Sequence, residues 1–203
     1  DRCVLVDEQG TLVDGDQLLY VLARDAQARG ELRGPVVGTA MSNLGLEQAL
    51  DALGIPFLRA AVGDRYVMSM LKANGGELGG ETSGHVINLA KTSTGDGLAT
   101  ALQVLGVMQR TGEPLSALVA GMQRMPQTMI NVRVGRRIDC DTVPEIRQEK
   151  AAVEAELGTR GRVVLRASGT EPLIRVMVEA TAAAEALSLA ERLAETVRAA
   201  AKH

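Results

Sequence analysis

A short glycine-rich segment, Gly79 to His85, holds the densest group of side chains that could do chemistry. It directly precedes an apolar run, Val86 to Leu89, which predicts a strand. The glycines permit a tight backbone, while Glu81, Ser83 and His85 supply a carboxylate, a hydroxyl and an imidazole. A carboxylate can accept hydrogen bonds from two adjacent hydroxyls, and an imidazole can transfer a proton near neutral pH. The segment therefore predicts a polyol site; the alternative is a turn whose Glu and His are merely solvated or capping.

A second candidate site lies between two predicted strands, in the segment Arg166 to Pro172. This segment offers a guanidinium group, two hydroxyls and a glycine, and Arg175 follows three residues later. Guanidinium forks and the free N–H groups of a glycine-containing turn are donors that bind a phosphate. The segment therefore predicts an anion site without a P-loop lysine. The alternative is an ordinary hairpin turn with arginine on its exposed face.

Two further polar turns do not indicate a particular function when taken alone. Asp1-Arg2 could be the last two residues of an acidic, metal-binding loop. The segment Val62 to Tyr66 places Asp64 and Arg65 between a predicted strand and a predicted helix. Short pairs of this kind occur often by chance. In isolation, both turns favour a purely structural interpretation.

Over the first 125 residues, short apolar runs alternate with amphipathic helical segments, and these elements must position the turns. Asp14 or Asp16 can cap the first helix, and Asp64 can cap a later one. Such alternation of apolar runs and amphipathic helices favours an α/β domain around a parallel or mixed sheet. We expect strands at 3–6, 36–41, 55–62 and 86–89, and helices at about 17–30, 44–53, 64–74, 96–109 and 114–123.

The pattern changes at Arg124 to Gln127, which predicts a domain boundary near residue 125. Apolar and polar residues alternate from 129 to 134, as in a half-exposed strand. The final helix carries Leu189, Leu193 and Val197 four residues apart, a stripe that predicts core packing. With a helix at 143–157 and strands at 162–167 and 173–179, these elements predict a smaller α+β C-terminal domain.

Composition and charge argue against several classes of function. The 203 residues carry 22 Lys and Arg against 25 Asp and Glu, a formal net charge of −3, so no nucleic acid or anionic membrane is expected as a partner. Only 1% of the residues are aromatic, which disfavours recognition by ring stacking. No apolar run reaches the roughly 18 residues of a membrane span. Cys3 and Cys140 are isolated, which predicts two reduced thiols in the cytoplasm.

Five segments, in their order along the chain, resemble the bacterial phosphoglucosamine mutase branch of the α-D-phosphohexomutase superfamily. That family has four domains, and the resemblance implies the end of the second at 1–10, the third α/β domain at 11–125 and the phosphate-binding C-terminal domain at 126–203. The start on Asp1, without an initiator Met, predicts the rear part of a longer protein. The segments are Asp1-Arg2, Thr39 to Gly45, Val62 to Val67, Gly80 to His85, and Arg166 to Met177.

The resemblance implies an isomerase activity, the reversible conversion of glucosamine 6-phosphate to glucosamine 1-phosphate. The product would feed UDP-N-acetylglucosamine and cell-wall synthesis in the cytoplasm. A phosphoserine would donate its phosphoryl group to a small phosphosugar, a sugar 1,6-bisphosphate would form and reorient, and Mg²⁺ would hold charge on the moving group. Homodimerisation of the full-length protein stays open.

The resemblance also implies roles for individual residues. Asp1 would bind the metal, Arg2 would lie beside the phosphoserine, and His85 would transfer a proton. The remaining expected substrate contacts are Asp64, Arg65, Glu81, Ser83 and Gly84 for the sugar, and Arg166, Ser168, Gly169, Thr170 and Arg175 for the phosphate.

The sequence departs from the family pattern in its missing phosphoserine loop and its missing first two metal aspartates. We therefore expect these 203 residues to be inactive alone, although the parent would be the mutase. One alternative is a sister enzyme for phosphoglucose or phosphomannose, because Glu81 can accept a hydrogen bond from either an amine or a hydroxyl. The other is a stand-alone, non-catalytic module that binds a sugar phosphate.

Overall fold

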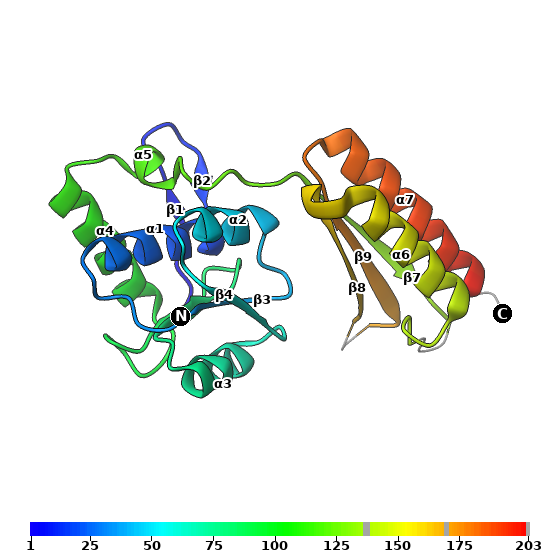
Figure 1. The fold of residues 1–203 in the computed structure, drawn as a ribbon, viewed down its shortest axis with the longest axis horizontal. Helices are drawn as coiled ribbons and strands as arrows, with labels where there is room; N and C mark the ends of the chain where they lie inside the picture. Colours follow the sequence, from blue (N-terminus) through cyan, green and yellow to red (C-terminus); the bar gives the residue numbers. More distant parts are fainter. Residues whose placement is uncertain (136–138, 169–170, 202–203) are drawn as a thin grey trace. The chain divides into compact units, whose positions relative to one another are not determined.

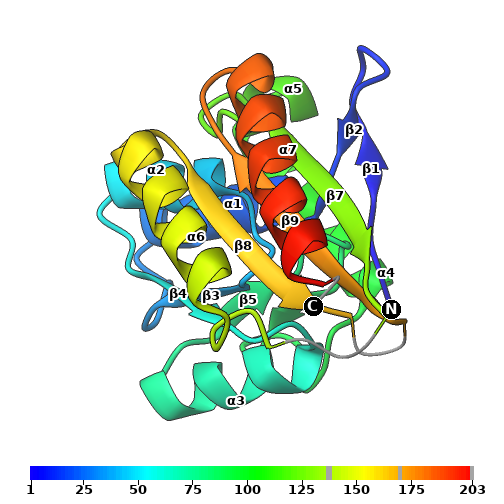
Figure 2. The ribbon, with the colours of Figure 1, turned by 90° about the vertical axis from the view of Figure 1, so that its right-hand side faces the viewer.

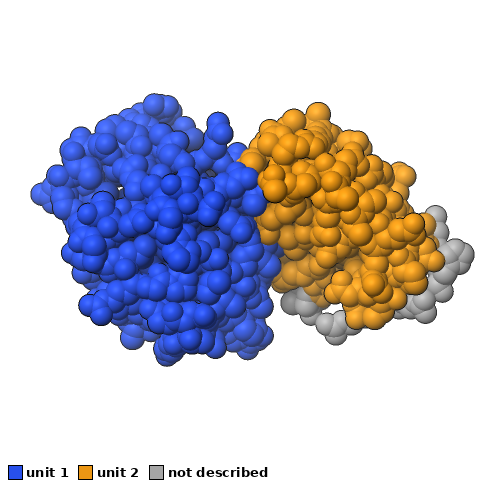
Figure 3. Space-filling view, in the orientation of Figure 1, with its two compact units in different colours: residues 1–124 blue, residues 125–203 orange. Residues whose placement is uncertain are grey.

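The computed structural model describes residues 1–135, 139–168 and 171–201. The chain divides into two compact units, Asp1–Arg124 and Met125–His203, which Figure 3 shows in different colours. Each unit has a hydrophobic core of its own. Residues 1–10 belong to the first unit, and their assignment to a preceding domain stays a prediction.

The first unit is built around a four-stranded mixed sheet (Figure 1). Its strands are β3 (Val36–Thr39), β4 (Phe57–Ala60), β5 (Leu78–Gly80) and β6 (Val86–Asn88). They lie in the order β4-β3-β5-β6, with β3 parallel to both neighbours and β6 antiparallel to β5. β3 is buried along its whole length, as a central strand covered on both faces must be. The α/β fold with a parallel or mixed sheet is thereby confirmed.

Strand β5 is absent from the sequence prediction, because its two glycines indicate a turn. Gly79 pairs with Val37 of β3, and a Cβ atom there would come too close to the Val37 carbonyl oxygen and to the side chain of Val67. Glycine is therefore needed where the sheet and a helix approach each other closely. The turn expected at Gly79 begins two residues later.

Helices cover both faces of this sheet. On one face, α3 (Asp64–Asn74) packs Val67 and Leu71 against Val37 and Ile87. On the other, α1 (Gly15–Ala28) contacts β5 and the remaining helices and forms the larger core. Those helices are α2 (Leu44–Ala52), α4 (Gly97–Thr111) and α5 (Leu115–Val119).

Several helix ends differ from, or refine, the sequence prediction. Asp64, expected to cap a helix, is instead the first residue of α3, and the preceding Gly63 is its N-cap without a side-chain bond. Asp14 caps α1 in a capping box with Gln17, so Asp16, the other candidate cap, lies inside the first turn. α5 ends at Val119, four residues before the expected end. The chain turns there so that Gly121 lies against the Tyr20 hydroxyl, where a Cβ atom would collide.

The strand expected at residues 3–6 is instead the first arm of a small hairpin. β1 (Leu5–Val6) pairs antiparallel with β2 (Leu12–Val13). The turn is closed by Asp7, whose Oδ1 accepts from the N–H groups of Gln9 and Thr11 at 2.9 and 2.8 Å. Because the Asp7 side chain closes the turn so early, only two residues of β1 pair with two residues of β2.

The second unit is a three-stranded antiparallel sheet with two helices on one face, as Figure 2 shows. Its elements are β7 (Gln127–Arg133), α6 (Pro144–Leu157), the 3₁₀ turn η1 (Gly158–Arg160), β8 (Arg162–Ala167), β9 (Leu173–Glu179) and α7 (Ala183–Ala200). β9 lies between β7 and β8, and its alternate residues Ile174, Val176 and Val178 join the core under the helices. The smaller α+β domain expected from the sequence is confirmed.

Helix α7 presents small side chains to this core. Ala186, Ala190 and Ala194, spaced four residues apart, are fully buried beside Leu189 and Leu193. Residues 125–203 contain no Phe, Tyr or Trp, so the packing is entirely aliphatic. Among the described residues, no helix combines the length and apolar character needed to cross a bilayer.

Candidate functional site

The turn between β5 and β6 holds Glu81 in a defined position. The N–H of Glu81 donates to the His85 carbonyl at 3.0 Å, and the N–H of Gly84 donates to the Glu81 carbonyl at 2.9 Å. Gly84 takes φ +92°, a conformation that favours glycine. The N–H of Gly63 donates to Oε1 of Glu81 at 3.0 Å, which fixes one carboxylate oxygen and so orients the other. Ser83 is exposed at the tip of the turn.

His85 is a buried imidazole flanked by two carboxylates. It is 6% exposed, with Nδ1 3.4 Å from Oδ2 of Asp1 and Nε2 4.0 Å from Oδ2 of Asp64. The side chains of Asp1 and Asp64 are 69% and 62% exposed, so each can meet a ligand. A Cβ atom at Gly95 would collide with Nε2, so glycine leaves room for the ring. The structure thus brings three expected site residues together around one proton-carrying group.

The N-terminal residues pack directly on this turn. The N–H of Cys3 donates to the Gly84 carbonyl at 2.9 Å, and Gly97 lies so close to the Arg2 backbone that a Cβ atom would collide. These contacts place Asp1 beside His85 and leave Arg2 exposed. Burial raises the pKa of the Cys3 thiol, which disfavours the nucleophilic thiolate.

Asp1 is the carboxylate expected to bind a metal ion. Within residues 1–135, 139–168 and 171–201, no three His, Cys, Asp or Glu side chains are grouped so as to hold one. Mg²⁺ takes an octahedral shell of oxygen ligands. Asp1 therefore offers one oxygen ligand and not a complete magnesium site.

Arg65 provides a positioned cation beside Asp64. Its guanidinium group lies 4.6 Å from the centre of the Tyr66 ring and donates to the Tyr66 hydroxyl at 2.8 Å. Stacking and hydrogen bonding together restrict this exposed side chain. Asp64 and Arg65 lie in the first turn of α3. The residue before this helix, Gly63, donates its N–H to the carboxylate of Glu81.

The second unit places two arginines directly opposite each other. Arg166 of β8 and Arg175 of β9 are register partners in an antiparallel pair, so their side chains leave the same face of the sheet. Asn131 of β7 is the partner of Arg175 on its other side. Like charges at opposed positions repel, and a bound anion would relieve that repulsion. This cross-strand row is chemically suited to hold a phosphate.

The loop that joins β8 to β9 carries the remaining phosphate candidates. Ser168 is buried; its N–H donates to the Leu173 carbonyl at 2.9 Å, and its Oγ accepts from the N–H of Glu171 at 3.2 Å. Ser168 therefore braces the loop. Gly169 and Thr170 lie outside the described residues.

Comparison with known protein families matches both units. Residues 14–125 match the family model described as phosphoglucomutase/phosphomannomutase, alpha/beta/alpha domain III, and residues 129–196 match that family's C-terminal domain. The chain belongs to the phosphoglucomutase/phosphomannomutase family.

Curated relatives of this chain include the phosphoglucosamine mutases of several bacteria. The protein of Methylococcus capsulatus is 55% identical over 97% of the chain, and that of Alkalilimnicola ehrlichii is 53% identical over 98%. The chain spans 44% of the length of each relative.

Solved structures share the fold at low sequence identity. Aspergillus fumigatus N-acetylphosphoglucosamine mutase, in complex with GlcNAc-6P and magnesium, matches 98% of the chain with a TM-score of 0.80 and 22% identity. The match covers 46% of that protein. A phosphoglucomutase/phosphomannomutase family protein from Burkholderia thailandensis covers 98% of this chain and 44% of its own, with a TM-score of 0.76 and 22% identity.

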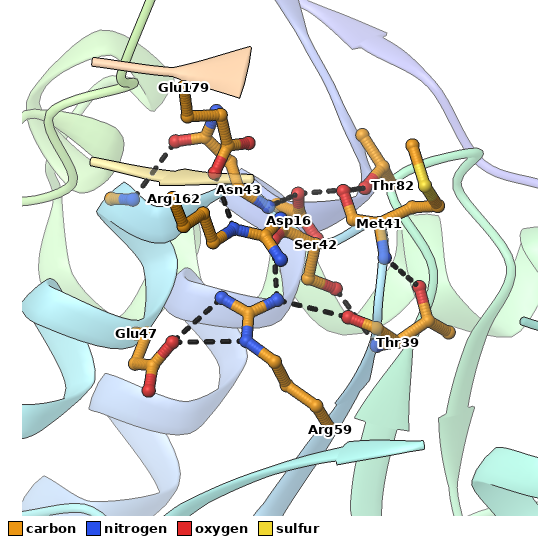
Figure 4. Close-up of polar contacts among 11 residues, drawn as sticks. Asp16, Thr39, Met41, Ser42, Asn43, Glu47, Arg59, Thr82, Arg162 and Glu179 are labelled. Atoms are coloured by element: carbon orange, nitrogen blue, oxygen red, sulfur yellow. Dashed lines mark hydrogen bonds and ion pairs between the residues drawn. The ribbon is translucent and has the colours of Figure 1, made fainter. Parts of the chain in front are cut away.

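The sequence did not indicate a site role for one buried carboxylate, Asp16. Its Oδ2 accepts from the Asn43 N–H and from the Thr82 hydroxyl, each at 2.8 Å (Figure 4). Burial raises the pKa of Asp16 to about 6, and these two hydrogen bonds limit the rise. The available signal was a second acidic residue two positions after the helix cap Asp14, and the sequence does not indicate which donors it binds.

The loop Thr39 to Asn43 is held from its other side by Arg59. The guanidinium group donates to the carbonyls of Thr39 and Ser42 at 3.0 and 2.7 Å and to Oε2 of Glu47 at 3.0 and 2.7 Å. Figure 4 shows this arginine below the loop, with Glu47 beside it. The loop is therefore a braced part of the site's surroundings.

Proposed function

We propose that this chain supplies the sugar-binding and phosphate-binding part of a phosphoglucosamine mutase, which interconverts glucosamine 6-phosphate and glucosamine 1-phosphate. The observation that carries the proposal is the buried His85 imidazole between the carboxylates of Asp1 and Asp64, with Glu81 on the same turn. The phosphoglucosamine mutases at 52–55% identity support the amino-sugar substrate.

Each side chain receives a role from its chemistry. Glu81, anchored by Gly63, accepts hydrogen bonds from neighbouring amine or hydroxyl groups of the sugar, and the exposed Ser83 hydroxyl adds a contact. His85 moves a proton to or from the reacting hydroxyl. Arg65 and Asp64 orient the sugar at the start of α3.

The phosphate that does not react would be held by the second unit. Arg166 and Arg175 offer paired guanidinium forks, and Ser168 braces the loop in which Gly169 and Thr170 would add donors. A phosphate held there would restrict the orientations open to the sugar that carries it.

Phosphoryl transfer itself needs groups beyond the described side chains. We assign the donating phosphoserine to the part of such a mutase that this chain does not span, with Arg2 beside it and Asp1 as one ligand of Mg²⁺. Mg²⁺ would neutralise charge on the transferred group, and a sugar 1,6-bisphosphate would be the intermediate. The 203 residues alone would then give no turnover, and measurable turnover by them would contradict this assignment.

The cellular setting follows from the proposed reaction. Its product would feed UDP-N-acetylglucosamine and peptidoglycan precursors in the cytoplasm, where the free thiols Cys3 and Cys140 stay reduced. The partner would be a phosphosugar and not a nucleic acid, given a net charge of −3. Homodimerisation of the full-length protein can be tested by sedimentation.

The decisive experiment measures a full-length mutase carrying these residues on glucosamine 6-phosphate. Glu81→Gln should lower kcat/KM by about 10²-fold, because the amide loses charge-assisted contacts to the sugar and to Gly63. Glu77→Gln, the same change just before β5, is the matched control and should leave kcat/KM unchanged. Equal effects of both variants would refute the role of Glu81.

A second candidate, a phosphoglucose or phosphomannose mutase, is favoured by the family model, whose description names those activities. Glu81 can accept from a hydroxyl as well as from an amine. A kcat/KM for glucose 6-phosphate or mannose 6-phosphate above that for glucosamine 6-phosphate would establish this candidate.

A further inference from the structure

The buried carboxylate of Asp16 connects the tip of the sugar turn to the loop that begins α2. We propose that Asp16 is a positioning residue, which holds Thr82 and thereby fixes the directions of Glu81 and Ser83. The inference rests on the proposed function only in naming a sugar as the ligand of those two residues.

Asp16 joins segments that are far apart in the sequence. It lies in the first turn of α1 and is fully buried. One oxygen, Oδ2, accepts from the Thr82 hydroxyl and from the Asn43 N–H, each at 2.8 Å. Asn43 in turn caps α2, since its Oδ1 accepts from the Gly45 N–H at 2.9 Å. A single carboxylate therefore sets the distance between the sugar turn and the start of α2.

Thr82 is held by its side chain and by its backbone. Its hydroxyl has one proton, and the Asp16 carboxylate at 2.8 Å is a better acceptor than the Met41 carbonyl at 3.3 Å. Its carbonyl accepts from the Gly15 N–H at 3.1 Å. Gly15 lies so close to the turn that a Cβ atom would collide with the Glu81 carbonyl. Because Thr82 stands between Glu81 and Ser83, rotation of its peptides would redirect both neighbours.

The chemistry of the site favours a carboxylate over an amide. An amide oxygen could accept from both donors that face Oδ2, but it carries no charge to strengthen those bonds. The amide nitrogen would then take the place of Oδ1, a buried atom with no hydrogen-bond partner among the described residues. The charged groups around Asp16 are Asp14, whose Oδ2 lies 3.4 Å from Arg124, and Arg59, which donates to the Thr39 and Ser42 carbonyls of the neighbouring loop. The charge of the Asp16 carboxylate is stabilised by hydrogen bonds from the Asn43 N–H and from the Thr82 and Ser42 hydroxyls.

The first test uses amide hydrogen exchange in the 203-residue chain, without any ligand. Asp16→Asn and Thr82→Val should each speed exchange at the Glu81 and Gly84 N–H groups about tenfold, because the first weakens and the second removes the hydrogen bond that holds the turn. The Asn43 N–H should exchange faster only in Asp16→Asn. Unchanged exchange at the turn in Thr82→Val would overturn the proposal.

A matched control separates local positioning from general loosening. Asp14→Asn alters the neighbouring carboxylate but keeps a residue that caps helices well, so exchange at Glu81 and Gly84 should stay within about twofold of the unmodified chain. The Leu71 amide in α3 reports the rest of the unit and should be unaffected by Thr82→Val. If Thr82→Val loosens Leu71 as strongly as Gly84, the hydroxyl is generally structural and the proposal fails.

The second test uses a full-length mutase carrying these residues. Thr82→Val should raise KM for glucosamine 6-phosphate about tenfold while inhibition by inorganic phosphate keeps its strength, because the phosphate clamp lies elsewhere. Weakening of both by the same factor would refute positioning of the sugar contacts. Absence of turnover in the unmodified enzyme would instead refute the proposed function and leave the exchange result to decide the role of Asp16.

Discussion

Asp16 should make the first unit less stable as the pH rises, and Asp16→Asn should abolish that dependence. Burial, opposed by hydrogen bonds from Asn43 and Thr82, raises the pKa of Asp16 from 3.8 to about 6. Because the folded-state pKa lies above the unfolded value, the folded protein binds this proton more tightly than the unfolded chain does. The resulting stability is present in full below the unfolded pKa and is lost as the pH rises through the folded pKa.

The size of the effect follows from the pKa difference. A rise from 3.8 to about 6 corresponds to about 3 kcal/mol of unfolding free energy. About 2 kcal/mol of this is lost between pH 4.5 and pH 8, where most of the folded-state titration takes place. Asparagine does not titrate, so the cost of its buried amide nitrogen, which would have no acceptor among the described residues at the Oδ1 position, is the same at every pH.

Urea unfolding followed by tyrosine fluorescence measures this difference. Tyr20 and Tyr66 are the only tyrosines, there is no Trp, and both lie in the first unit, so the signal follows that unit alone. Between pH 4.5 and 8, stability of Asp16→Asn relative to the unmodified chain should rise by about 2 kcal/mol. Asp51→Asn, which removes an exposed carboxylate of α2, is the control. A constant difference between the two proteins across this range would refute the argument from burial.

Three further substitutions test other contacts. Gly95→Ala should displace the buried His85 ring, lowering mutase kcat about 10²-fold and tyrosine-detected stability by about 1–3 kcal/mol, and an unchanged kcat would contradict the packing argument. Arg166→Gln should stabilise the second unit by a few tenths of a kcal/mol in phosphate-free buffer by relieving repulsion from Arg175, yet weaken phosphate binding measured by calorimetry; a loss of stability would count against this account. Gly106→Ala, where a Cβ atom meets no neighbour, should stabilise α4 by about 1 kcal/mol in urea unfolding, and destabilisation would show hidden crowding.

Elements with a strong pattern were predictable from the sequence. The alternation from 129 to 134 places Val132 in the core and leaves Asn131 exposed, as the structure of β7 confirms. The stripe Leu189, Leu193 and Val197 packs as expected on the inner side of α7. Period alone determines which side of such elements is apolar, so burial follows from the sequence.

Elements defined by long-range contacts were not predictable. Gly79 and Gly80 indicate a turn, and only the neighbouring helix and β3 make them a strand. The hairpin at residues 5–13 depends on the Asp7 side chain, which closes its turn. Local propensity is weak in both places, and tertiary packing decides the conformation.

In the candidate site, too, the sequence indicates the residue types, while long-range contacts determine their arrangement. Residue types alone indicated Glu81, His85 and the arginines, because few side chains offer their chemistry. Their distances depend on which turns the fold brings together, as with Asp1 and His85 at 3.4 Å. The role of Asp16 depends on donors 27 and 66 positions away, and no local pattern contains that information.

The alanines on the inner side of α7 restrict how this unit can change over evolution. Ala186, Ala190 and Ala194 have no exposed surface, and close packing leaves no space for a larger side chain under the helix. A saturation screen should therefore accept only Gly, Ser or Ala at these positions, while exposed positions such as Glu191 and Glu195 tolerate most residues. Descendants of this sequence would then vary freely on one side of α7 and stay almost invariant on the other.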